Sequence, residues 1–106
     1  MSLREKQETV DRWISQYEEG YFTPLTNLAR LTEEVGELAR EINHRHGQKT
    51  KKPDEAEGSL AMELADILFV VICLANSQKI DLDQAFDQMM AKVTARDAGR
   101  WTRKAR

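Results

Sequence analysis

The chain has 106 residues, a length that predicts a single domain. Its formal net charge of −2 and its sequence pI near 5.7 argue against general affinity for nucleic acid or for a membrane surface. The first residues lack the apolar core of a signal peptide, and a single cysteine, Cys73, excludes an intramolecular disulfide. We therefore expect a protein of the reducing cytoplasm, with no nucleic-acid or membrane partner.

Four segments have the periodicity of helices, and no stretch alternates as a strand would. Thr23 followed by Pro24 is typical of a helix start, as are Asp54 with Glu57 and Asp81 with Gln84. The predicted helices cover residues 2–18, 24–43, 55–77 and 82–98, with a basic loop at 44–53 and a basic tail at 99–106. Helices joined by short links predict an all-α, four-helix bundle.

The most distinctive stretch is the apolar run at residues 60–75, which contains no Gly or Pro. At 100° per residue its apolar side chains cover every side, a pattern that predicts a helix surrounded by protein. The run is shorter than the roughly 20 residues that a membrane span needs, and it contains two acids, Glu63 and Asp66. Since so small a domain can hardly cover such a helix, we expect the chain to self-associate and to bury it between subunits.

Apolar stripes on the neighbouring helices indicate which sides face the core. The second helix carries one stripe, made of Leu25, Leu28, Leu31, Val35, Leu38 and Ile42. The fourth helix is expected to turn an apolar side inward, made of Phe86, Met89, Met90 and Val93.

Two acidic pairs with i, i+3 spacing are the candidate chemical groups: Glu34 with Glu37, and Glu63 with Asp66. Helices joined by one connection are usually antiparallel neighbours, so the pairs can face each other. A cation-rich partner helix or a bound metal would compensate the charges on the buried helix. For the second-helix acids alone, a solvated helix face is the better interpretation. Taken together, the two pairs favour a site for Mg²⁺ or Mn²⁺, built from oxygen ligands.

The two acidic segments also carry a family resemblance. Glu33-Glu34-Val35-Gly36-Glu37, followed by Glu63-Leu64-Ala65-Asp66, resembles the EExxE…ExxD signature of the MazG-like nucleotide pyrophosphohydrolases, and the resemblance covers residues 10–97. It implies an all-α NTP pyrophosphatase fold that forms a homo-oligomer, either a dimer or a tetramer built from dimers. It also implies Mg²⁺-dependent hydrolysis of an NTP or dNTP to the monophosphate and pyrophosphate, with Mn²⁺ as a substitute.

The resemblance assigns roles to individual residues. The implied metal ligands, which are also catalytic, are Glu34, Glu37, Glu63 and Asp66. Glu33 is the candidate for orienting or deprotonating the attacking water. Lys92 and Arg96 would hold phosphate oxygens, although Met89 stands where the family often has an Asn three residues before this lysine.

The group that recognises the base is less well defined by the sequence. Trp13 is the candidate for stacking on a nucleobase, and the other candidates for contacting the base are Tyr17, Tyr21, Phe22, His44 and His46. Aromatic residues at helical spacing are more often part of a core. The basic loop at 44–53 either closes over the phosphates or is simply solvated.

Two non-enzymatic alternatives stand beside the enzyme. One is a helical metal-binding adaptor or regulatory dimerisation domain, which would be expected to lack a ligand or a phosphate-holding base. The other is a structural metal-binding bundle, which has no use for Lys92 and Arg96. All of these residues are present, which favours the enzyme.

Overall fold

The computed structural model describes residues 1–47 and 59–105, and within these ranges it contains four helices and no strand. The helices are α1 (Leu3–Ile14), α2 (Pro24–His46), α3 (Leu60–Ser77) and α4 (Leu82–Asp97). The all-α class is therefore as predicted. Each helix begins after a residue whose side chain accepts a backbone N–H of the first turn, and these caps are Ser2, Thr23, Ser59 and Asp81.

Three helix ends differ from the predicted ones by more than one residue. α1 ends at Ile14 rather than near residue 18, because the chain tightens there into a turn in which the Tyr17 N–H donates to the Ile14 carbonyl. α2 continues to His46, so residues 44–46 of the predicted loop are helical, and residues 48–53 of it lie outside the described residues. α3 begins at Leu60, after its cap Ser59, and the predicted capping pair of Asp54 and Glu57 lies outside the described residues.

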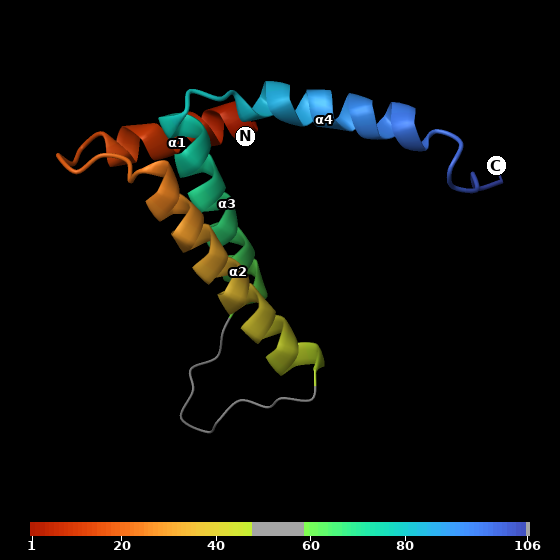
Figure 1. Cartoon of the computed structure of the whole chain (residues 1–106), viewed down its shortest axis with the longest axis horizontal. Coiled ribbons are helices and arrows are strands. Elements are labelled where there is room, and N and C mark those ends of the chain that lie inside the picture. The colour runs from red at the N-terminus through yellow and green to blue at the C-terminus, as the bar shows by residue number, and fades with distance from the viewer. Residues whose placement is uncertain (48–58, 106) are drawn as a thin grey trace.

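The two longest helices, α2 and α3, lie side by side as an antiparallel pair (Figure 1). α1 crosses the end of this pair and packs against α3, while α4 packs against α1 and projects away from the pair (Figure 1). The fourth helix thus extends outward instead of completing a closed bundle within one chain.

Gln7 holds the junction of α1, α3 and α4 together. Its buried side-chain amide donates to the Asn76 Oδ1 at 2.9 Å and to the Ile80 carbonyl at 2.7 Å. Its Oε1 accepts the Leu82 N–H at 2.9 Å, at the start of α4. Asn76 also donates to the Tyr21 hydroxyl at 2.9 Å, which ties the α1–α2 link to the same point. These bonds fix the direction in which α4 leaves the body.

The apolar core of the described residues is small and lies in the second half of α3. Val70, Ile72, Cys73 and Ala75 are its buried members. The first half of the same helix is open, and Met62 and Leu64 are 61% and 52% exposed. One chain therefore covers only part of the helix that is apolar on every side.

Helix α3 is also the one described helix long and apolar enough to cross a membrane by length and composition, with a mean hydropathy of 1.9. The core helix of a soluble protein passes the same test, so this observation is weak evidence for a span.

Helices α2 and α4 also differ from their predicted packing. On α2, Leu31 and Leu38 are half-buried, whereas Leu28, Val35 and Ile42 of the same stripe are exposed. The buried α2 residues are instead polar, Asn27 and Glu41. On α4, the prediction that Phe86, Met89 and Met90 point into a core is wrong for the single chain, because α4 leaves the α2–α3 pair and these side chains are exposed.

Candidate active site

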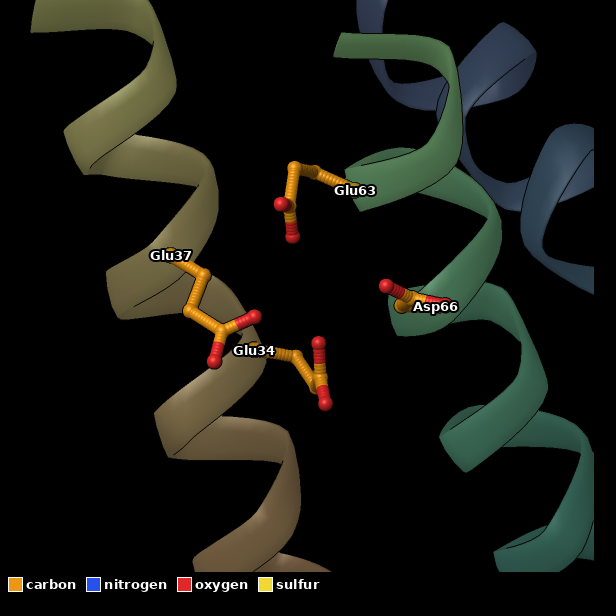
Figure 2. Close-up of side chains that lie close together, drawn as sticks. All are labelled: Glu34, Glu37, Glu63 and Asp66. Atoms are coloured by element: carbon orange, nitrogen blue, oxygen red, sulfur yellow. The ribbon is translucent and has the colours of Figure 1, made fainter. Parts of the chain in front are cut away.

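The two acidic pairs predicted from the sequence face each other across the α2–α3 pair. Glu34 and Glu37 project from α2 and Glu63 and Asp66 from α3, into the space between the two helices (Figure 2). One carboxylate oxygen from each residue lies within 4.8 Å of the others. We call these four residues the carboxylate cluster.

Burial and mutual repulsion change the acidity of the cluster. The pKa of Glu34 is raised, first by burial and then by the charges of Glu37, Asp66 and Glu63. The pKa of Glu63 is raised in the same way, by burial and by the neighbouring carboxylates of Glu37 and Asp66. The Oε2 atoms of Glu34 and Glu63 are buried and have no hydrogen-bond partner among the described residues. A bound cation would offset the charge of the ionised cluster and satisfy these oxygens.

The donor set fits a hard divalent ion. All four groups are carboxylates, the ligands that Mg²⁺ and Mn²⁺ prefer over the His and Cys ligands of zinc sites. Opposite ligands of one octahedral Mg²⁺ are about 4 Å apart and neighbouring ligands about 3 Å, so the four oxygens, which lie within 4.8 Å of one another, would move closer together around an ion. The unpartnered buried oxygens of Glu34 and Glu63 are the atoms that an ion would satisfy.

A cavity of about 410 Å³ is lined by residues of α1, the α1–α2 link, α2 and α3, and the four carboxylates are not among them. Five of its eleven lining residues are aromatic: Trp13, Tyr17, Tyr21, Phe22 and Phe69. We call it the aromatic cavity. Phe69 stands one turn of α3 after Asp66 of the cluster, and Trp13 packs edge-on against Phe69 with ring centroids 6.2 Å apart. The cavity therefore lies about one helical turn from the carboxylates, on the side toward the α1–α2 link.

Two polar residues of α2 line the same cavity, and sequence reasoning missed both. Asn27 is 1% exposed; its amide donates to the Phe22 carbonyl at 3.3 Å, while its Oδ1 has no partner among the described residues. The guanidinium of Arg30 lies over the Phe22 ring, 5.2 Å from the centroid. In sequence, Asn27 and Arg30 look like ordinary polar positions of an amphipathic helix, and only their spacing of seven and four residues before Glu34 places them on the cluster's face.

The other site residues predicted from the sequence lie outside the carboxylate cluster. Glu33 is exposed and outside the cluster, one residue before Glu34. Trp13 is half-exposed and lines the aromatic cavity. Lys92 and Arg96 are exposed on α4, which projects away from the α2–α3 pair, and Arg96 pairs with Asp97 at 3.0 Å. Within one chain, the carboxylates and the cavity are therefore both on the α2–α3 pair, whereas the two basic side chains of α4 lie away from it.

Comparison with known proteins identifies the class to which this fold and cluster belong. The model of the MazG nucleotide pyrophosphohydrolase domain matches residues 22–101, which include the whole cluster and α4. The chain belongs to the MazG nucleotide pyrophosphohydrolase family, and it is accordingly a hydrolase acting on pyrophosphate bonds, with a nucleotide substrate implied by the family.

Individual relatives agree with this assignment. The uncharacterized protein YpjD of Bacillus subtilis (strain 168) is 54% identical over 103 residues, which cover 97% of this chain and 93% of that protein. The crystal structure of YpjD from Bacillus subtilis, described there as a candidate pyrophosphatase, matches with a TM-score of 0.78 and 53% identity, over 87% of this chain and 94% of that one. A Bacillus-conserved MazG protein, described as a nucleotide pyrophosphohydrolase, matches with a TM-score of 0.77 and 47% identity, over 88% and 90% of the two chains. Both structures have this chain's all-α fold.

Proposed function

We propose that the protein is a Mg²⁺-dependent nucleoside triphosphate pyrophosphohydrolase, which converts an NTP or dNTP to the monophosphate and pyrophosphate. The observation that carries the proposal is the carboxylate cluster, with two buried oxygens that have no partner among the described residues. The proposed ligands of the ion are Glu34, Glu37, Glu63 and Asp66. When bound, Mg²⁺ would offset the charge of the triphosphate and lower the pKa of an attacking water. Mn²⁺ is the expected substitute.

The chain's own residues would then bind and orient the nucleotide. The aromatic cavity has room for a nucleobase, and Trp13 offers a face for stacking at its wall. A base held there places the phosphates beside the carboxylate cluster. Glu33 is the proposed acceptor for the proton of the water, a role that requires its exposed carboxylate to turn toward the substrate.

We also propose that the active form is a homo-oligomer. Leu28, Val35 and Ile42 recur at seven-residue spacing, so they share one side of α2, and all three are exposed. The first half of α3 adds the exposed Met62 and Leu64. Apolar surface of this extent on one chain supports burial against a second copy.

An oligomer would also give a role to the two basic side chains of α4. Because α4 projects away from its own α2–α3 pair (Figure 1), we propose that Lys92 and Arg96 reach the cluster of a partner subunit in the oligomer. The partners proposed for the chain are therefore a nucleotide and further copies of itself. A cytoplasmic setting is proposed on the basis of the single buried Cys73.

The test is pyrophosphate release from a panel of NTPs and dNTPs, with Mg²⁺, with Mn²⁺ and with a chelator. The proposal predicts metal-dependent release from at least one nucleotide. In ¹⁸O-labelled water, attack at the α-phosphorus predicts label in the monophosphate and none in the pyrophosphate. Release of orthophosphate, or release that survives the chelator, would rule the proposal out.

A further inference from the structure

Among the described residues that line the aromatic cavity, Arg30 is the one with a cationic side chain. It stands about one helical turn before Glu34 on the same face of α2, about 6 Å along the axis. Arg30 therefore occupies the boundary between the proposed base site and the proposed metal site.

The guanidinium of Arg30 is not committed to a carboxylate. It forms no ion pair within 4.0 Å among the described residues, in contrast to Arg4, Arg45 and Arg96, which pair with acids at 2.7, 2.9 and 3.0 Å. Its contact is with the face of the Phe22 ring, 5.2 Å from the centroid, which supports the guanidinium plane and leaves its N–H donors available. Half-buried arginines with free donors are suited to phosphate oxygens, which the planar fork can bind through two hydrogen bonds.

The direction of a bound nucleotide follows from the order of residues along this face. Asn27 is at the cavity end, Arg30 follows, and Glu34 and Glu37 come next. A base in the cavity and a metal-bound triphosphate at the cluster would place the phosphate nearest the sugar beside Arg30. This phosphate remains on the nucleotide after pyrophosphate leaves.

We propose that Arg30 is the phosphate-binding residue that each chain supplies to its own site, where it holds the phosphate that is retained in the monophosphate product. The inference rests on the proposed function for its substrate class, and it differs from the roles of Lys92 and Arg96, which lie on the projecting α4. It assigns Arg30 to the binding of nucleotide and product, without a role in holding the metal.

Binding of the product tests this inference without any turnover. The affinity of dAMP, dCMP, dGMP and dTMP, and of the four matching deoxynucleosides, is measured by calorimetry in the presence of Mg²⁺ for the wild type and for Arg30→Gln. Because Arg30→Gln removes a charge-assisted hydrogen bond, we expect about a tenfold or greater loss of affinity for the monophosphate that binds most tightly. The affinity for the matching nucleoside should change less than twofold. Arg30→Lys keeps the charge but not the planar guanidinium. Its affinity for the monophosphate should lie between that of the wild type and that of Arg30→Gln.

Two controls separate phosphate binding from a structural effect. Arg12→Gln, on the exposed side of α1 and outside the cavity, should bind monophosphate as the wild type does. Mn²⁺ affinity of the carboxylate cluster, followed by electron paramagnetic resonance, should be unchanged in Arg30→Gln.

The outcomes distinguish this inference from the proposed function. An equal loss of affinity for nucleoside and monophosphate would mean that Arg30 only shapes the cavity, and loss of Mn²⁺ binding would mean that it supports the cluster; either result overturns the inference. Unchanged monophosphate affinity, or no monophosphate binding by the wild type, also overturns it. If no triphosphate is hydrolysed, the proposed function fails, yet a phosphate-specific loss in Arg30→Gln would still support the inference.

Discussion

At the scale of single residues, the site depends on carboxylates that are buried without partners. Glu63 belongs to a helix with almost no other charge, and one of its oxygens has no partner among the described residues. Its raised pKa means that the folded chain holds the proton of Glu63 more tightly than the unfolded chain does. Without metal, ionisation of Glu63 therefore opposes folding.

This reasoning predicts the behaviour of metal-free Glu63→Gln. At pH 8, with chelator, its urea midpoint should equal or exceed that of the wild type, because the substitution removes repulsion from Glu37 and Asp66. The difference should fade as the pH falls through the raised pKa, and vanish below the ordinary value of about 4.3, where Glu63 is uncharged in both states. Glu18→Gln, in the exposed α1–α2 link, is the control. A strongly destabilised Glu63→Gln at pH 8 would indicate a structural ion pair instead.

Sequence predicted the cluster because i, i+3 spacing forces each acidic pair onto one face of its helix. It did not predict Arg30 or Asn27 as parts of the site. A single arginine or asparagine on an amphipathic helix is normally solvated, and nothing local distinguishes these two. What singles them out is the aromatic cavity, which forms only when α1, α2 and α3 meet.

At the scale of elements, polar side chains set the arrangement of the helices as much as apolar ones do. Between α2 and α3, the buried positions of α2 are Asn27 and Glu41, and Glu41 pairs with Arg45 at 2.9 Å. At the other end, Gln7 connects α1 to the end of α3 and to the start of α4. No local sequence pattern indicates this role, because the bonding partners of Gln7 are 69 to 75 residues away.

We expect Gln7→Ala to lower the free energy of unfolding by about 2 to 4 kcal/mol, because it leaves several buried polar groups without partners. Urea denaturation measures the change. Gln16→Ala, at an exposed position just after α1, should change it by less than about 0.5 kcal/mol. An equally small effect at Gln7 would show that water replaces its bonds and that the junction is held by packing.

At the scale of the whole molecule, the outward direction of α4 leaves apolar and basic side chains away from the chain's own site. The expectation that its apolar side faces a core came from periodicity, which reports that a face is apolar but not what covers it. The same limit applies to the stripe on α2. Both faces are consistent with the proposed oligomer, in which a second chain would cover them.

A mixing experiment tests whether α4 serves a partner's site. Glu63→Gln lacks a metal ligand, and the Lys92→Ala/Arg96→Ala variant lacks the two basic side chains of α4. Each variant alone should therefore be inactive, although the second should still bind metal. Coexpression of both should restore about a quarter of wild-type activity if the oligomer is a dimer, since half of randomly paired dimers are mixed and each mixed dimer has one complete site. If a mixed dimer isolated by two tags recovers no activity, Lys92 and Arg96 act within their own chain.

The most direct test of the central claim is the rate of pyrophosphate release as Mg²⁺ is raised, compared between the wild type and Glu63→Gln on the nucleotide that the panel ranks first. The claim predicts a saturable dependence on Mg²⁺ in the wild type, with monophosphate and pyrophosphate formed in equal amounts. It also predicts a loss of about a hundredfold or more in Glu63→Gln, because a metal ligand is gone. Wild-type rates in Glu63→Gln at every Mg²⁺ concentration would show that the carboxylate cluster is not where the reaction occurs.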